Sequence, residues 1–343
     1  MIKRIAVLTG GGDVPGLNAA IRAVVRRAEA KQFEVVGVRD GWRGLIDDDT
    51  LALSRDAVSG ILPKGGTMLG TSRTNPLKAK DGMARIKATL ARHRIDALVA
   101  IGGDDTLGAA ARLNQDGIPV VGVPKTMDND VRGTDVTIGF DTAVNTVMEA
   151  LDRLHTTADS HHRIMVVEVM GRDAGWVATA AGLAGGADVV LVPEVPFDLD
   201  EVCATLRKRR ATGRQFSIVV AAEGVTLKDA KGQVVQNTEV DAFGHARLGG
   251  IGTLLAGEIE RRMEHETRAT SLGHVQRGGA PTAFDRVLAT RFGIAAVDEL
   301  ASGRTGVMVA LRGTSIVTVP LEEVLAGPRP LDLDLYAATR LFS

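Results

Sequence analysis

Short apolar runs alternate along this chain with longer stretches in which apolar residues recur at helical spacing. The apolar runs predict buried strands at residues 5–8, 34–38, 97–101, 119–123, 164–169 and 216–222. Helical patterns follow several of them, over residues 18–28, from Leu107, and from about residue 141 to 157. Apolar strands that alternate with helices are typical of a parallel sheet covered by helices on both faces. The pattern therefore predicts an α/β fold.

The second half of the chain repeats this plan and adds a polar segment. The longest apolar region, residues 174–192, is rich in Gly and Ala and contains Asp188, so we interpret it as a buried helix and strand rather than a membrane span. Residues 225–247 are hydrophilic, and a turn at residues 229–232 predicts a hairpin or surface loop. Three further elements are predicted: a helix from about residue 252 to 265, a helix opened by Pro281, and a strand at residues 306–311.

Several predicted strands end in glycine or charged residues. These ends are the loop of residues 10–12, Asp104 with Asp105, residues 125–130, residues 170–172, Glu223, and residues 274–277. In open parallel sheets, ligands bind outside the carboxyl ends of the strands. Six such ends on one sheet edge therefore predict a ligand site there.

Residues 124–130 (Pro-Lys-Thr-Met-Asp-Asn-Asp) carry the densest chemistry in the chain. Lys125, Thr126, Asp128 and a second aspartate supply an ammonium, a hydroxyl and two carboxylates within six residues. An ordinary turn could use Asp128, Asn129 and Asp130 for backbone hydrogen bonds alone. The other charged strand ends favour a catalytic carboxylate instead.

Asp104 and Asp105 directly precede the helical pattern that starts at Leu107. Acidic residues stabilise a helix N-terminus, so capping is one interpretation. Two adjacent carboxylates exceed what one cap requires, and Mg²⁺ binds one or two carboxylates together with phosphate oxygens and water. A divalent cation held by one of the two aspartates is the alternative.

The glycines at residues 10–12 lie between a strand and a helix, where backbone amides can bind phosphate. The loop matches neither common phosphate-binding motif, so a tight turn is the alternative. Five cations outnumber what a neutral substrate requires, and arginine suits bidentate phosphate binding. They are Lys125, Arg163, Arg172, Arg268 and Arg277. A glycine loop, an acidic metal site, a carboxylate base and these cations together indicate phosphoryl transfer.

Composition narrows the class of protein. A length of 343 residues suggests two domains or one two-lobed unit. A net charge of -1 and 3% aromatic residues argue against a nucleic-acid partner. Cys203 is the only cysteine, which excludes an internal disulfide and suits a reducing cytoplasm. The chain starts without a signal-peptide pattern, and we expect a cytoplasmic protein without a membrane partner.

Five ordered motifs make the sequence resemble the phosphofructokinase family over nearly its whole length. They are residues 11–18 (Gly-Gly-Asp-Val-Pro-Gly-Leu-Asn), 102–106 (Gly-Gly-Asp-Asp-Thr), 124–130, 170–172 (Met-Gly-Arg) and 272–279 (Leu-Gly-His-Val-Gln-Arg-Gly-Gly). The resemblance implies two Rossmann-like lobes, each with a mainly parallel sheet flanked by helices, and an active site in the cleft between them. The phosphoryl donor and Mg²⁺ would bind a lobe of residues 1–139 and about 276–327. Fructose 6-phosphate would bind a lobe of residues 140–275 and about 328–343.

The resemblance also implies roles for individual residues. Asp128 is the base that takes the proton from the 1-hydroxyl of fructose 6-phosphate, Asp104 is the acid of the Mg²⁺ site, and Gly12 contacts the donor. The residues that face the sugar phosphate are Thr126, Met170, Gly171, Arg172, Glu223, His274 and Arg277, with Arg172 also counted as catalytic. Arg163 and Arg268 match family residues that reach into a neighbouring subunit's site, which implies a homodimer or homotetramer with shared active sites.

Asp105 and Lys125 resemble the branch of the family that uses pyrophosphate. The ATP-using pattern has glycine at the first position and usually glycine at the second. Glycine leaves room for the inner phosphate of a nucleotide, whereas Asp105 fills that space with negative charge and Lys125 can offset charge on the transferring group. Both residues are therefore assigned to catalysis and donor binding, in a reversible step of glycolysis or gluconeogenesis.

Three other functions are alternatives to this hypothesis. The first is an ATP-dependent 6-phosphofructokinase of the same fold. The second is a lipid or NAD kinase, which shares a loop like residues 102–106 but would lack the other four motifs. The third is an inactive sugar-phosphate sensor, although Asp104 and Asp128 are both present.

Overall fold

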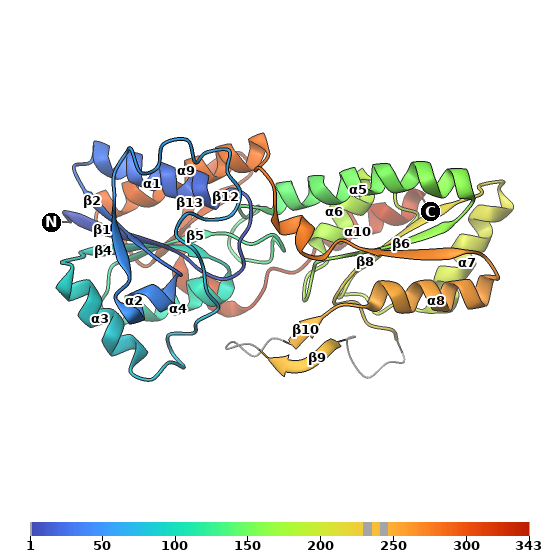
Figure 1. Ribbon diagram of the computed structural model, residues 1–343, viewed down its shortest axis with the longest axis horizontal. Coiled ribbons are helices and arrows are strands. Elements are labelled where there is room, and N and C mark those ends of the chain that lie inside the picture. The colour runs from blue at the N-terminus through green and yellow to red at the C-terminus, as the bar shows by residue number, and fades with distance from the viewer. Residues whose placement is uncertain (1, 229–234, 241–245, 343) are drawn as a thin grey trace. The chain divides into compact units, whose positions relative to one another are not determined.

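The computed structural model describes residues 2–228, 235–240 and 246–342, which form two compact units with separate sheets (Figure 1). Unit 1 contains Met1–Asp141 and Arg277–Arg329, and unit 2 contains Thr142–Val240, Ala246–Gln276 and Pro330–Ser343. Both units are therefore assembled from segments that lie far apart in the sequence.

The sheet of unit 1 has seven strands. In spatial order they are β13 (Ser315–Pro320), β12 (Val307–Arg312), β5 (Val120–Pro124), β4 (Ala97–Gly102), β1 (Arg4–Thr9), β2 (Glu34–Val38) and β3 (Thr50–Leu53). The five central strands are parallel, and the two edge strands, β3 and β13, are antiparallel to their neighbours. Every residue of β4 and β5 is buried, as expected for strands covered on both faces.

Helices cover both faces of this sheet (Figure 1). One face carries α1 (Leu17–Ala30) and α9 (Ala283–Ala301), and the other carries α2 (Trp42–Asp47), α3 (Gly82–Arg92), α4 (Asp104–Gln115) and η2 (Leu321–Ala326). Helices α1 and α9 approach closely at Gly293, where a Cβ atom would lie 2.7 Å from the carbonyl oxygen of Ala20. The C-terminal part of unit 1 thus completes a layer that the N-terminal part begins.

The sheet of unit 2 has four parallel strands. In spatial order they are β11 (Thr267–Ser271), β6 (Ile164–Val169), β8 (Ser217–Ala222) and β7 (Val189–Leu191). The helices are α5 (Phe140–His161), α6 (Trp176–Ala184), α7 (Leu199–Ala211), α8 (Ile251–Met263), α10 (Leu333–Thr339), and the short η1 (Gly273–Arg277) and η3 (Arg340–Phe342). Together the two sheets confirm the predicted α/β class with mainly parallel strands.

The polar excursion contains an antiparallel pair of strands, β9 (Val235–Val240) and β10 (Ala246–Leu248). The predicted turn at residues 229–232 lies outside the described residues. The apolar region of residues 174–192 forms α6 and β7, which confirms its interpretation as a helix and a strand. Among the described residues, no helix is both long enough and apolar enough to span a lipid bilayer.

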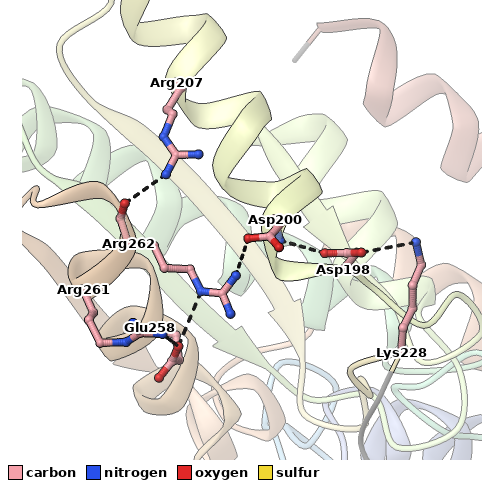
Figure 2. Close-up of polar contacts among 7 residues, drawn as sticks. All are labelled: Asp198, Asp200, Arg207, Lys228, Glu258, Arg261 and Arg262. Carbon is pink, nitrogen blue, oxygen red and sulfur yellow. Dashed lines mark hydrogen bonds and ion pairs between the residues drawn. The ribbon is translucent and has the colours of Figure 1, made fainter.

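Charged side chains link α7 to α8 on the surface of unit 2 (Figure 2). Arg262 of α8 pairs with Asp200 and approaches Glu258 at 3.6 Å, and Arg207 of α7 donates to the carbonyl oxygen of Arg262 at 2.9 Å. Asp198 accepts from the backbone amide of Asp200 at 2.8 Å and so caps α7. Exposed ion pairs of this kind contribute little stability. We therefore interpret this network as solvent-exposed contacts that align α7 with α8.

Candidate functional site

The six strand ends with site-like residues belong to two sheets, so the prediction of one sheet edge is wrong. β1, β4 and β5 end in unit 1, whereas β6, β8 and β11 end in unit 2. Apolar runs predict strands but not their partners, and here α5 separates two series of strands that share no sheet. The predicted residues therefore form a first cluster in unit 1 and a second cluster in unit 2.

The loop of residues 10–13, directly after β1, directs its carbonyl oxygens toward side chains. Lys125 Nζ donates to the oxygens of Gly10 at 2.9 Å and Gly12 at 2.6 Å, Thr71 Oγ1 donates to Gly11 at 2.6 Å, and Arg277 Nη1 donates to Asp13 at 3.3 Å. Four consecutive carbonyl groups are thus satisfied by the protein. The loop ends three residues before α1, so its amides are not part of that helix terminus.

The amide groups of the same loop divide into two pairs. Gly10 donates to Ile101 at 3.0 Å, and Gly11 donates to Ser72 at 3.2 Å. Within residues 2–228, 235–240 and 246–342, the amides of Gly12 and Asp13 donate no hydrogen bond. Two adjacent amides beside two cations are an arrangement that binds phosphate oxygens.

Close packing explains the glycines of this loop. A Cβ atom at Gly12 would lie 2.6 Å from Arg277 Nη1, and one at Gly10 would lie 2.6 Å from Thr106 Oγ1. Gly11 has a φ of 78°, which favours glycine. Thr106 is a residue that sequence reasoning did not assign to the site, and its position in the Gly-Gly-Asp-Asp-Thr motif was the available signal.

Lys125 is fully buried at the end of β5, with 2% of its surface exposed. Burial, and then the nearby positive charge of Arg277, lower the pKa of Lys125 to about 7, although Asp13, Asp104 and Asp128 act in the opposite direction. Within the described part of the chain, the ammonium donates to neutral carbonyl oxygens alone. An anion bound beside it would favour the charged form of the lysine.

Asp104 and Asp105 form the first turn of α4, which starts three residues earlier than predicted. The N-cap is Gly103, and no side chain caps the helix, so neither aspartate serves as the N-cap residue. Their charges lie at the positive end of the helix dipole. Among the described residues, no group of three His, Cys, Asp or Glu side chains could hold a metal ion, so a cation at Asp104 would need oxygen ligands from a substrate.

Asp128 lies in a loop that its neighbours organise. Thr126 Oγ1 accepts from the backbone amide of Asp128 at 3.2 Å, and Thr137 Oγ1 donates to the carbonyl oxygen of Thr126 at 2.6 Å. Asn129 is buried with a φ of 54°, and its Oδ1 accepts from the amide of Thr137 at 2.9 Å. The backbone-bonding interpretation is therefore correct for Asn129, and the Asp128 side chain beside it is half-buried.

The second cluster gathers where β6 and β8 end. The amide of Glu223 donates to Val169 at 2.8 Å, and the amide of Gly224 donates to Gly171 at 3.1 Å. Gly171 has a φ of 140°, and a Cβ atom there would lie 2.7 Å from the carbonyl oxygen of Ala174. These contacts bring Met170, Gly171 and Arg172 beside Glu223.

Two buried residues that sequence reasoning did not assign support this cluster. Gln276 Oε1 accepts from the amide of Met170 at 3.3 Å, and its Nε2 donates to Gly273 at 3.0 Å, which places the turn that carries His274. The Glu168 carboxylate accepts from the amide of Gly252 at 2.8 Å, at the start of α8. A lone acid in an apolar strand was the signal for Glu168, whereas nothing in the pattern distinguished Gln276.

Arg163 and Arg268 lie together in unit 2, because both pair with Glu266. The distances to Glu266 Oε1 are 2.8 Å from Arg163 Nη2 and 2.7 Å from Arg268 Nη2. The hydrogen bond from Arg163 is the main cause that lowers the pKa of Glu266. Arg277, by contrast, belongs to unit 1, and its guanidinium contacts the glycine loop of the first cluster.

Comparison with known proteins gives one consistent result. Residues 4–300 match the family model described as Phosphofructokinase. The chain is 55% identical to a pyrophosphate--fructose 6-phosphate 1-phosphotransferase of Streptomyces coelicolor, over 99% of both chains. It is 53% identical to ATP-dependent 6-phosphofructokinase 3 of the same species, over 97% of this chain and 98% of that one. A pyrophosphate-dependent phosphofructokinase from Marinobacter aquaeolei superposes with a TM-score of 0.83 at 25% identity, over 97% and 86% of the two chains.

Proposed function

Because the chain belongs to the phosphofructokinase family, we propose that it transfers a phosphoryl group from pyrophosphate to the 1-hydroxyl of fructose 6-phosphate. The products are fructose 1,6-bisphosphate and phosphate. The full-length relatives at 55–56% identity carry this activity in their names. ATP-dependent relatives are almost as similar, so the choice of donor must rest on individual residues.

The arrangement of Lys125 carries the proposal for pyrophosphate. Its buried ammonium donates to the carbonyl oxygens of Gly10 and Gly12, beside the amides of Gly12 and Asp13, which donate no hydrogen bond to any described residue. Arg277 adds a second cation to the same loop. A compact, highly charged donor without a nucleoside suits a site that places two cations beside two backbone amides.

In the proposed reaction, the Asp128 carboxylate takes the proton of the 1-hydroxyl as that oxygen attacks one phosphorus atom of pyrophosphate. The bond from this phosphorus to the bridging oxygen breaks, and phosphate leaves. Lys125 stabilises negative charge on the transferring phosphoryl group. Asp105 fills the space that the inner phosphate of a nucleotide would need. The residues of the second cluster and Thr126 are proposed to bind fructose 6-phosphate. Arg277 is also proposed to bind the sugar phosphate, and in the structure its guanidinium donates to the carbonyl oxygen of Asp13.

Mg²⁺ fits the oxygen chemistry of the first cluster. Asp104 is exposed at the N-terminus of α4 and would hold the ion, with pyrophosphate oxygens and water completing its coordination. When bound, the ion neutralises charge on the phosphate oxygens. The protein itself would supply one carboxylate to the ion, and the amides of Gly12 and Asp13 would remain for the phosphate oxygens.

The donor assay tests this function directly. Wild-type enzyme with fructose 6-phosphate and Mg²⁺ is expected to show a clearly higher kcat/KM with pyrophosphate than with ATP. The matched measurement uses the same enzyme preparation with each donor, and the phosphate or ADP released is quantified. Equal or better turnover with ATP would reject the pyrophosphate assignment and favour an ATP-dependent 6-phosphofructokinase.

A homodimer or homotetramer with shared sites is the proposed assembly, because Arg163 and Arg268 match residues that family members donate across an interface. Both arginines lie on one surface and share the Glu266 carboxylate within the chain. Mixing inactive Asp128→Asn with inactive Arg268→Ala subunits should regenerate sites that combine the intact halves. Each variant refolded alone is the control, and an active monomer in sedimentation would contradict the assembly.

A further inference from the structure

Residues 128–137, here called the Asp128 loop, have no helical or strand structure and must be held by other contacts. Asn129 closes the loop from inside: its Nδ2 donates to the carbonyl oxygen of Asp135 at 3.2 Å, and its Oδ1 accepts from Thr137. The turn between β12 and β13 supports one side, where the amide of Gly313 donates to Asp135 Oδ2 at 2.7 Å. These contacts hold Asn129 and residues 135–137 of the loop.

A second support comes from residues 327–329, here called the strap. Arg132 extends from the Asp128 loop, and its Nε and Nη2 donate to the carbonyl oxygens of Gly327 at 3.3 Å and Pro328 at 3.1 Å. In the reverse direction, the amide of Arg329 donates to the carbonyl oxygen of Asp130 at 2.6 Å, and its guanidinium donates to Asp135. Loop and strap therefore hold each other through hydrogen bonds in both directions.

The geometry of these bonds depends on arginine at residue 132. Two nitrogen atoms of one planar guanidinium donate to two consecutive carbonyl groups, and the fixed fork of the guanidinium sets their geometry. The strap allows this because Gly327 has a φ of 90°, in the region that favours glycine. Directly after Arg329 the chain enters unit 2 at Pro330, so the strap is also where the last segment leaves unit 1.

We infer that Arg132 is a positioning residue for Asp128 and acts through the strap. This inference rests on the proposed role of Asp128 as the base. Arg132 has no place in the donor or sugar contacts described above. Its bonds instead hold the strap, and the amide of Arg329 in the strap donates to the carbonyl oxygen of Asp130, two residues from the reacting carboxylate. A general base is effective only within hydrogen-bond reach of its proton.

The test compares Arg132→Met, which keeps the length of the side chain and removes both donors, with wild type. We expect kcat for the pyrophosphate reaction to fall roughly 10- to 100-fold, because a displacement of about 1 Å can cost that much. The KM values for both substrates should stay within about twofold, since no proposed ligand contact changes. Arg207→Met is the matched control: it also removes an arginine-to-carbonyl hydrogen bond, in unit 2, and should leave kcat unchanged.

Hydrogen exchange supplies a readout that does not depend on activity. Backbone amides of residues 128–137 should exchange faster in Arg132→Met, while peptides from the four-stranded sheet of unit 2 should exchange as in wild type. Unchanged exchange in the loop, a wild-type kcat, or a rise in KM at constant kcat would each overturn the inference. If wild type itself lacked the pyrophosphate reaction, the proposed function would fail, and exchange would still decide whether Arg132 holds the loop.

Discussion

Asp128→Asn is expected to lower kcat by about 10²–10⁴-fold, the usual contribution of general acid–base catalysis. The substitution keeps the shape of the side chain and removes its capacity to accept a proton. The loop should stay in place, because its contacts to Thr126 and Thr137 use backbone groups and other side chains. KM for fructose 6-phosphate should change little.

Steady-state rates with pyrophosphate and Mg²⁺ measure this effect, and thermal unfolding checks that the variant is folded. Asp116→Asn is a suitable control, since it makes the same chemical change in the same unit, at the C-cap of α4. Its kcat should equal that of wild type. Turnover of Asp128→Asn within a few-fold of wild type would show that another group removes the proton.

Asp105→Gly is expected to shift the preference between donors toward ATP by more than tenfold. An inner phosphate of ATP would approach the Asp105 carboxylate, and two unit charges about 4 Å apart repel by roughly 4 kcal/mol at an effective dielectric constant of about 20. Half of that repulsion already exceeds one decade of affinity, which corresponds to about 1.4 kcal/mol. The glycine removes both the charge and the bulk.

The readout is kcat/KM for each donor in wild type, Asp105→Gly and Asp105→Asn. The asparagine variant removes the charge but keeps the size, so it separates repulsion from steric exclusion. Pyrophosphate use should weaken in Asp105→Gly without full ATP activity, because Lys125 remains. Glycine in the first turn of α4 also costs about 1 kcal/mol of helix stability, which unfolding measurements would reveal. A donor ratio identical in all three proteins would exclude Asp105 as the determinant.

The fold class could be predicted from the sequence because parallel strands buried on both faces leave continuous apolar runs. Four strands coincide with predicted apolar runs, and every residue in them is buried: β4, β5, β6 and β8. The grouping of these strands into two sheets could not be predicted, because pairing depends on contacts between distant segments. The edge strand β3 was also missed, since its four residues are mostly half-buried or exposed and lack a strong pattern.

The chemistry of the site was more predictable than its support. Residue types at strand ends indicated Asp104, Lys125 and Asp128 before any coordinates, and their catalytic roles stay predictions. The bonds from Lys125 to Gly10 and Gly12 could not be inferred, because a lysine near a phosphate loop could equally face solvent. The bonds from Arg132 to the strap join positions almost two hundred residues apart, and no local pattern marks such a pair.

Unit 1 is built mainly from two segments that lie on either side of the larger part of unit 2 in the sequence, and this order has a consequence during synthesis on the ribosome. β5 needs β12 as its outer neighbour, and α1 needs α9 as its cover, but both partners lie beyond residue 282. At about 5–20 residues per second, the delay between translating β5 and α9 is on the order of 10 s. For that time the nascent chain exposes the open edge of β5 and the uncovered face of α1 to solvent, and an unpaired strand edge can pair with another chain. Unit 2 can begin to fold meanwhile, but it also needs the segment that starts at Pro330, so both units are complete only when the end of the chain has been translated.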